Sequence, residues 1–194
     1  MHKDIVLAGV GGQGVLSLAA ILAEAARREG LHVKQGELHC TSQRGGAVEA
    51  FLRMDEEPVL SDFVSEGAAD LVLALEPVEG LRAAHFLKPD GLLLTAIDPV
   101  ENIPDHPGRE QVLTMLDTLP HAIWIEAGSL ARAAGSARTI NAVMVGAASL
   151  ALPLRVETLL ACLREGFASK GESAVRMNLA AFDAGRQAAS CATN

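Results

Sequence analysis

The sequence predicts an α/β protein with a three-layer, Rossmann-like fold, in which helices cover both faces of a mostly parallel sheet. The first observation is that the apolar run Ile5–Ala8 leads into the glycine-rich stretch Gly9–Gly14, after which residues 15–26 repeat apolar side chains at helical spacing. The second is that short, almost continuous apolar runs alternate with helical patterns further on, which is typical of strands buried between layers of helices. With 194 residues, the chain is expected to form a single domain over residues 1–194.

The first helix is expected to end at residues 27–30, where two arginines precede a glycine. A strand at Leu31–Glu37 follows, and we expect it to run parallel to the first strand after a right-handed crossover. In residues 47–54, Val48, Ala50 and Leu52 alternate with Glu49, Phe51 and Arg53, and the turn residues 55–58 lead into Val59–Leu60. This pattern predicts a β-hairpin inserted into the parallel sheet.

The remaining chain predicts three more strands and a helical carboxyl-terminal portion. A turn is expected at Pro89–Gly91, because proline, aspartate and glycine follow one another there. The last helix carries Val175, Leu179, Phe182 and Ala189 on one apolar stripe, which is typical of a helix packed on the core. The strands are expected at 71–75, 92–97 and 122–125, the last of them buried, and the helices at 77–87, 109–116, 129–134, 139–152, 156–167 and 173–189.

Composition limits the function. A net charge of −8 and 3% aromatic residues argue against nucleic-acid binding, which requires a basic face and stacking side chains. No apolar run approaches the ~18 residues of a membrane span. Residues 1–4 lead straight into a strand, so no signal peptide is expected and the protein is predicted to be cytoplasmic. Cys40, Cys162 and Cys191 are too far apart for a CxxC metal or cluster motif.

The first glycine loop is a candidate ligand site. Gly9, Gly11 and Gly14 have the GxGxxG spacing, and the free amides at the start of the following helix favour an anion. The alternative is that these glycines serve only a tight turn and helix–strand packing. Glu37, about 23 residues beyond Gly14, could act as the ribose-binding acid of an NAD or FAD enzyme.

A second polar, glycine-terminated loop is expected at the same carboxyl edge of the sheet, where ligands bind in open parallel sheets. It contains Ser42 and Gln43 as neutral hydrogen-bonding groups, Arg44 as a fork for phosphate or carboxylate, and Gly45 and Gly46, which let backbone amides face a ligand. The alternative is a surface turn whose arginine caps a neighbouring helix.

Carboxylates follow four predicted strands, at Glu37, Glu76, Asp98 and Glu126. An acid–base or metal cluster is one interpretation, but a carboxylate after a strand commonly caps a helix, and the prolines after Glu76 and Asp98 favour that role. The pair His39–Cys40 is not expected to be catalytic, because neighbouring residues of an extended chain point to opposite faces.

The two glycine motifs together resemble a known family. Gly9-Val10-Gly11-Gly12-Gln13-Gly14, followed about thirty residues later by Ser42-Gln43-Arg44-Gly45-Gly46, is similar to the gamma-type subunit of 2-oxoacid:acceptor oxidoreductases, and within them to the indolepyruvate:ferredoxin oxidoreductases. Residues 74–77, 87–91 and 139–147 support the resemblance in the same order. Cys40-Thr41 depart from the glycine and methionine that family members often carry there.

The resemblance implies a non-catalytic subunit that completes the active site of its partner and binds coenzyme A. Thiamine diphosphate, Mg²⁺ and iron–sulfur clusters are then expected on the partner alpha subunit, with ferredoxin as electron acceptor and an aryl pyruvate such as indolepyruvate as substrate. A homodimer is the assembly considered for the isolated chain. The candidate cofactor-binding residues that the resemblance carries over are Gly9, Gly11, Gly12, Gln13, Gly14, Ser42, Gln43, Arg44, Gly45, Gly46 and Asn141.

Two other hypotheses remain at this stage. The first is a free-standing oxidoreductase that binds NAD or FAD through the GxGxxG turn and Glu37. The second is a scaffold subunit whose loops dock on a partner and bind no small ligand.

Overall fold

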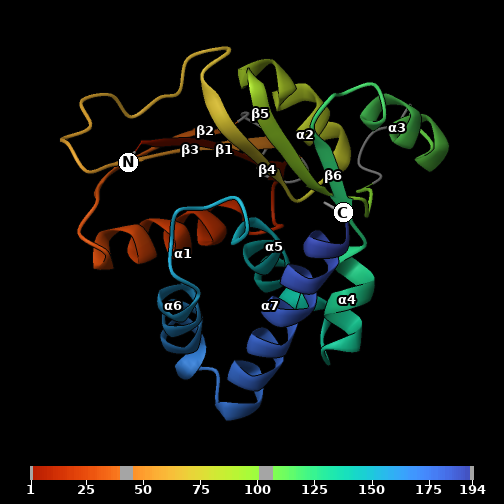
Figure 1. The fold of residues 1–194 in the computed structure, drawn as a ribbon. Helices are drawn as coiled ribbons and strands as arrows, with labels where there is room; N and C mark the ends of the chain where they lie inside the picture. Colours follow the sequence, from red (N-terminus) through yellow and green to blue (C-terminus); the bar gives the residue numbers. More distant parts are fainter. Residues whose placement is uncertain (1, 40–45, 101–106, 193–194) are drawn as a thin grey trace.

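A six-stranded sheet organises the chain (Figure 1). The computed structural model describes residues 2–39, 46–100 and 107–192. In the sheet the strands lie in the order β2-β3-β1-β4-β5-β6, and β3 is antiparallel to both of its neighbours while the other adjacent pairs are parallel. Five strands therefore share one direction, and the predicted mostly parallel sheet is confirmed. The strands are β1 (Lys3–Val10), β2 (His32–His39), β3 (Ala47–Asp55), β4 (Ala69–Ala74), β5 (Leu87–Ala96) and β6 (Ala122–Ile125).

The hairpin differs from the prediction. Residues 47–54 do form a strand, but β3 pairs with β2 along its whole length, from His32 opposite Asp55 to His39 opposite Val48. Val59–Leu60 is not a strand, and the Leu60 side chain is 92% exposed. Since β3 is also bonded to β1, it separates β1 from β2, which run in the same direction without touching.

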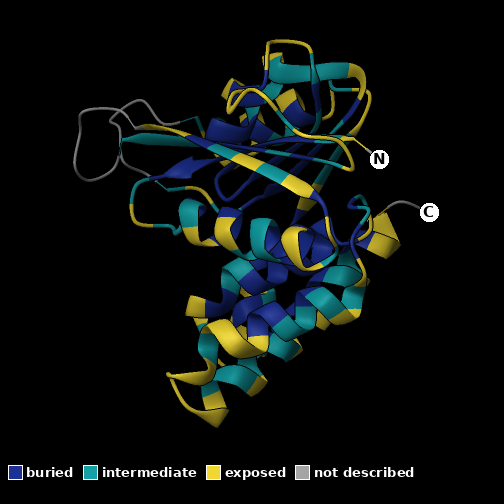
Figure 2. Cartoon of the chain, turned by 90° about the vertical axis from the view of Figure 1, so that its left-hand side faces the viewer, coloured by how far each residue is buried: buried dark blue, intermediate teal, exposed yellow. Residues whose placement is uncertain are grey.

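Side-chain alternation along β1 divides the interior into two cores. Ile5 and Leu7 face one side of the sheet, and Val6 and Ala8 face the other. Buried residues accordingly concentrate in the strands and on the helix faces turned toward them (Figure 2). The first side is covered by α1 (Val15–Arg28), α4 (Ala127–Ala133), α5 (Ile140–Ala148), α6 (Val156–Ala168) and α7 (Glu172–Ala192), and the second by α2 (Pro77–Ala83) and α3 (Arg109–Leu116).

Two local predictions about the strands are wrong. The Pro89–Gly91 segment does not end a helix with a turn but lies inside β5, where the register with β4 shifts between Ala69 and Leu71. The strand β6 is only partly buried: it is the last strand of the sheet, and although the Ile125 side chain is buried, the Trp124 side chain is 39% exposed. The predicted helix 77–87 is also shorter, since a 3-10 turn at Ala84–Phe86 replaces its end.

The helix α5 is the centre of the helical portion, and seven of its nine residues are buried. It crosses α7 at two glycines, Gly146 and Gly185, each of which lies against the backbone of the other helix. Of the apolar stripe on α7, Phe182 and Ala189 are buried as predicted, whereas Val175 and Leu179 are only partly covered. Within the described ranges, no helix is both long and apolar enough to span a membrane.

Candidate functional site

The first glycine loop connects β1 to α1 at the carboxyl edge of the sheet. Gly12 and Gly14 have φ values of +99° and +86°, which side-chain-bearing residues rarely adopt. The Gln13 amide donates to the carbonyl of Val10 over 3.0 Å, and the Leu18 amide donates to the carbonyl of Gly14 over 3.0 Å, so that the turn passes directly into the helix. The predicted strand, glycine turn and helix are thus present.

The loop also contacts the end of the second glycine motif. The Gly11 amide donates to the carbonyl of Gly46 over 2.9 Å. This hydrogen bond joins two residues 35 positions apart in the sequence (46 − 11) and places Gly46, the last residue of the second motif, beside the first glycine loop. The other predicted residues of that motif, Ser42, Gln43, Arg44 and Gly45, lie outside the described residues, as does Cys40.

The side chain of Gln13 is directed into the protein. Its Oε1 accepts from the Val10 amide over 2.7 Å, and its Nε2 donates to the Leu75 carbonyl over 3.1 Å, so one amide group ties the end of β1 to the residue after β4. A Cβ on Gly9 would come within 2.8 Å of Gln13 Oε1. We therefore expect Gln13 and Gly9 to shape the loop, and a ligand to meet its backbone.

Truncating this side chain should loosen the loop. Gln13→Ala is expected to lower the free energy of unfolding by about 2 kcal/mol, because two hydrogen bonds worth about 1 kcal/mol each are lost. Urea unfolding of the purified chain measures this effect. The matched control is Gln111→Ala, an exposed glutamine on α3, which should change the free energy of unfolding by less than about 0.5 kcal/mol. Equal effects of the two substitutions would show that Gln13 does not hold the loop.

Asn141 reaches the first loop from α5. Its Nδ2 donates to the Gly14 carbonyl over 3.1 Å, across 127 residues of sequence. Its Oδ1 is buried and, among the described residues, has no hydrogen-bond partner. A buried acceptor without a donor is costly and rare in folded proteins, so this oxygen is suited to accept an N–H or O–H from a ligand or a water molecule.

The amino terminus of α1 is open to an anion. Gly14 occupies the N-cap position and so provides no capping side chain, and the first turn of the helix holds no acidic residue. The amides there carry the partial positive charge of a helix start. With Asn141 beside them, these amides could bind a phosphate group while the asparagine accepts a hydrogen bond from the same molecule.

The carboxylates at the strand ends have structural partners. Glu76 caps α2, because its Oε2 accepts from the Glu79 amide over 2.8 Å. Asp98 Oδ2 accepts from the Gly128 amide over 2.7 Å, in the first turn of α4, and Glu126 pairs with Arg109 at 2.7 Å. The capping interpretation is thereby confirmed for Glu76. Asp98 also accepts a hydrogen bond from the start of a helix, but this helix is α4 and not α3, the next helix in the chain.

Glu79, which the sequence motifs did not indicate, is buried beside Glu76. Burial raises the pKa of the Glu79 carboxyl, and repulsion from Glu76 and Glu49 adds to this effect, while the nearby Arg82 opposes it at 2.9 Å. Its position in the first turn of a helix that begins with Pro77 is the signal that could have indicated it.

Glu37 does not lie where an NAD-binding acid is needed. Its register partner on β3 is Ala50, which is in turn opposite Leu7 of β1. Glu37 is therefore two strands away from β1, roughly 10 Å at the usual strand spacing. In the dinucleotide fold the second strand lies next to the first. The inserted β3 thus removes the geometric basis for the NAD or FAD hypothesis.

Across the described ranges, His, Cys, Asp and Glu form no group of three or more that could hold a metal ion. Cys162 is buried, and burial raises the pKa of its thiol, so that it is a packing residue and not a thiolate nucleophile. Cys191 is exposed near the end of α7.

A protein-family model and several relatives match nearly the whole chain. The family model described as pyruvate ferredoxin/flavodoxin oxidoreductase matches residues 4–188. The chain is 37% identical over 196 residues to the indolepyruvate oxidoreductase subunit IorB of Pyrococcus horikoshii, covering 96% of this chain and 95% of the relative. It is 28% identical to the common gamma subunit of the pyruvate/ketoisovalerate oxidoreductases of Pyrococcus abyssi, covering 93% and 95%.

Solved structures show the same fold. The chain is similar to a 2-oxoglutarate:ferredoxin oxidoreductase from Magnetococcus marinus with 2-oxoglutarate, coenzyme A and succinyl-CoA bound, with a TM-score of 0.79 and 25% identity. That match covers 98% of this chain but only 31% of the other, which is much longer. The gamma subunit of a keto/oxoacid ferredoxin oxidoreductase from Geobacter sulfurreducens matches with a TM-score of 0.71 and 25% identity, over 98% and 99% of the two chains.

Proposed function

The chain belongs to the pyruvate ferredoxin/flavodoxin oxidoreductase family, and on this premise we propose that it is the non-catalytic subunit that binds coenzyme A and completes the active site of a thiamine-bearing partner. The assembly would oxidatively decarboxylate a 2-oxoacid, with an aryl pyruvate such as indolepyruvate as substrate and ferredoxin as electron acceptor. The protein would act in the cytoplasm.

One observation supports the coenzyme A proposal: the Gly11–Gly46 hydrogen bond holds the last residue of the second glycine motif against the first loop, at the uncapped start of α1, where Asn141 Oδ1 has no partner among the described residues. Coenzyme A has phosphate groups for the helix amides and amide N–H and hydroxyl groups for the asparagine oxygen. The residues present therefore fit this molecule.

The residues of this chain would bind coenzyme A and orient it. The amides at the start of α1 would hold a phosphate, Asn141 would accept a hydrogen bond, and Arg44 would add a positive charge from the second loop. Thiamine diphosphate with Mg²⁺ and iron–sulfur clusters, all expected on the partner, would supply the decarboxylation and the electron transfer. This chain would thereby raise the local concentration of coenzyme A and fix its orientation at the partner's active site.

Calorimetry tests the proposal directly. Coenzyme A is titrated into the lone chain and into its complex with the thiamine-bearing subunit, with NAD as the control titrant. We expect coenzyme A to bind, more tightly in the complex, and NAD not to bind. Binding of NAD without any effect of a partner would instead support the free-standing dehydrogenase.

Two further results would narrow the proposal. If the Arg44→Ala chain, mixed with the thiamine-bearing subunit, supports coenzyme A-dependent decarboxylation with unchanged affinity for coenzyme A, Arg44 is not part of the site. A complex that assembles and turns over while coenzyme A binds only the partner would leave this chain a scaffold. Sedimentation of the lone chain reports whether it forms a homodimer.

A further inference from the structure

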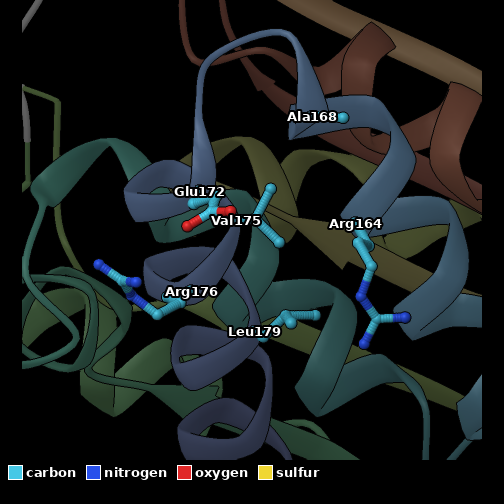
Figure 3. A pocket seen from close by; sticks show the side chains of 6 residues that line it. All are labelled: Arg164, Ala168, Glu172, Val175, Arg176 and Leu179. Atoms are coloured by element: carbon cyan, nitrogen blue, oxygen red, sulfur yellow. The ribbon is translucent and has the colours of Figure 1, made fainter.

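A groove lies between α6 and α7, on the helical side of the molecule (Figure 3). It encloses about 440 Å³, and it is distinct from the glycine loops, since none of its residues belongs to them. The two helices form a hairpin that extends away from the sheet (Figure 1). The groove is lined by Arg164, Ala168, Glu172, Val175, Arg176 and Leu179.

The floor of the groove is apolar and incompletely covered. Val175 and Leu179 are four residues apart on α7 and point from that helix toward α6 (Figure 3). They belong to the same stripe as Phe182 and Ala189, which are buried in the main core. The other helices of the chain therefore cover the stripe at Phe182 and Ala189, whereas its first half, at Val175 and Leu179, stays partly exposed.

The rims of the groove carry positive charge. Arg164 reaches from α6 and Arg176 from α7, on opposite sides of the two apolar side chains (Figure 3). Within the described ranges, neither guanidinium has an ion pair or a side-chain hydrogen bond, and Glu172 is the one carboxylate that lines the groove.

The geometry points to this groove as the docking site for an acidic, amphipathic helix of the thiamine-bearing partner, an inference that rests on the proposed function. A helix that lays apolar residues at i, i+3 and i+4 spacing along Val175 and Leu179 would cover the exposed end of the stripe. Carboxylates on its two flanks would face Arg164 and Arg176. Docking here would attach the partner without occupying the edge of the sheet that carries the glycine loops.

The first test removes both rim charges. The dissociation constant of the complex between the chain and the thiamine-bearing subunit is measured for the Arg164→Gln/Arg176→Gln variant. We expect it to rise about tenfold at about 0.05 M salt, and the difference to shrink at about 0.5 M salt, because exposed charge pairs are screened. The matched control is Arg132→Gln/Arg138→Gln, which removes the same charge from exposed residues on and beside α4 and should leave the constant unchanged.

The second test addresses the floor. Val175→Glu places a carboxylate among the apolar side chains and between the two arginines, so it should weaken the complex at both salt concentrations. Val175 is partly exposed, and circular dichroism would verify that the variant is folded. Equal dissociation constants for the wild-type chain, the rim variant and Val175→Glu would overturn the docking proposal.

Failure of this proposal can be separated from failure of the proposed function. If the complex forms and coenzyme A binds, but the groove variants change nothing, only the docking site is wrong. If the groove variants weaken the complex while coenzyme A never binds, the docking site stands and the chain is a scaffold. If the wild-type chain forms no complex, both fall. Self-association that the rim variant abolishes would assign the groove to a second copy and overturn the assignment to the partner.

Discussion

Replacing Gly14 with alanine is expected to weaken coenzyme A binding at least about tenfold, which corresponds to a loss of about 1.4 kcal/mol of binding free energy. Gly14 has a φ of +86°, and a Cβ at this position would lie 2.7 Å from Asn141 Nδ2. The asparagine must therefore move away from the Gly14 carbonyl, and the amides at the start of α1 would turn with the loop. Calorimetric titration of coenzyme A measures the effect.

The matched control lies at the other end of the same helix. Gly30 has a φ of +82°, and a Cβ there would meet no atom within 4 Å. Gly14→Ala and Gly30→Ala should both cost about 1–2 kcal/mol of stability from left-handed backbone strain. Only Gly14→Ala should change the affinity for coenzyme A, because the new methyl group would displace the Asn141 side chain, whereas the one on Gly30 would meet no atom.

A double-mutant cycle separates the contact from the backbone strain. In an Asn141→Ala background the asparagine cannot be displaced, so Gly14→Ala should there lower affinity by less than it does in the wild-type chain. Additive effects on affinity would mean that the two residues act independently and would contradict the role given to their contact. Unchanged affinity for coenzyme A in both single variants and in the double variant would show that Gly14 and Asn141 are not part of the ligand site.

The parts of the fold that depend on residues close together in the sequence could be predicted. The apolar run before Gly9 and the helical spacing after Gly14 define β1, the loop and α1. The bounds of α3 and β6 agree with the prediction, because proline, glycine and polar residues flank both elements. In these segments the backbone conformation is determined by side chains within a few residues.

The pairing of strands could not be predicted in this way. Nothing in the spacing of β1, β2 and β3 indicates that β3 inserts between the other two, because this arrangement depends on contacts between residues 37 or more positions apart, from Val10 opposite Ala47 to Lys3 opposite Met54. The same insertion moves Glu37 away from the glycine loop. The exposure of Trp124 also follows from strand order, since an apolar four-residue run looks the same at the edge of a sheet as at its centre.

At the candidate site, the sequence predicts the glycine turn between β1 and α1 but not the direction of the side chains around it. The family resemblance places Gln13 among the binding residues, yet both ends of its amide are bonded inside the protein. Asn141 entered only through the family resemblance, since no local pattern links it to a loop 127 residues earlier. Its hydrogen bond to Gly14 depends on the position of α5, and that position depends on α7.

Replacing Gly185 with alanine is therefore expected to affect both stability and the site. A Cβ on Gly185 would overlap with the carbonyl oxygen of Val143, and a Cβ on Gly146 would overlap with that of Phe182, so α5 and α7 cannot keep their contact. We expect Gly185→Ala to lower the free energy of unfolding by about 3 kcal/mol, the upper end for an overpacked core. Urea or thermal unfolding measures this loss.

The sign of the change in the free energy of unfolding distinguishes an effect on helix packing from an effect on helix propensity. Gly166 lies in α6, and a Cβ there would meet no atom within 4 Å, so Gly166→Ala should stabilise the chain by up to about 1 kcal/mol through better helix propensity. A stabilising Gly185→Ala would show that α5 and α7 are not in close contact. If Gly185→Ala destabilises as expected, it should also weaken coenzyme A binding, because Asn141 is the second residue of the displaced helix.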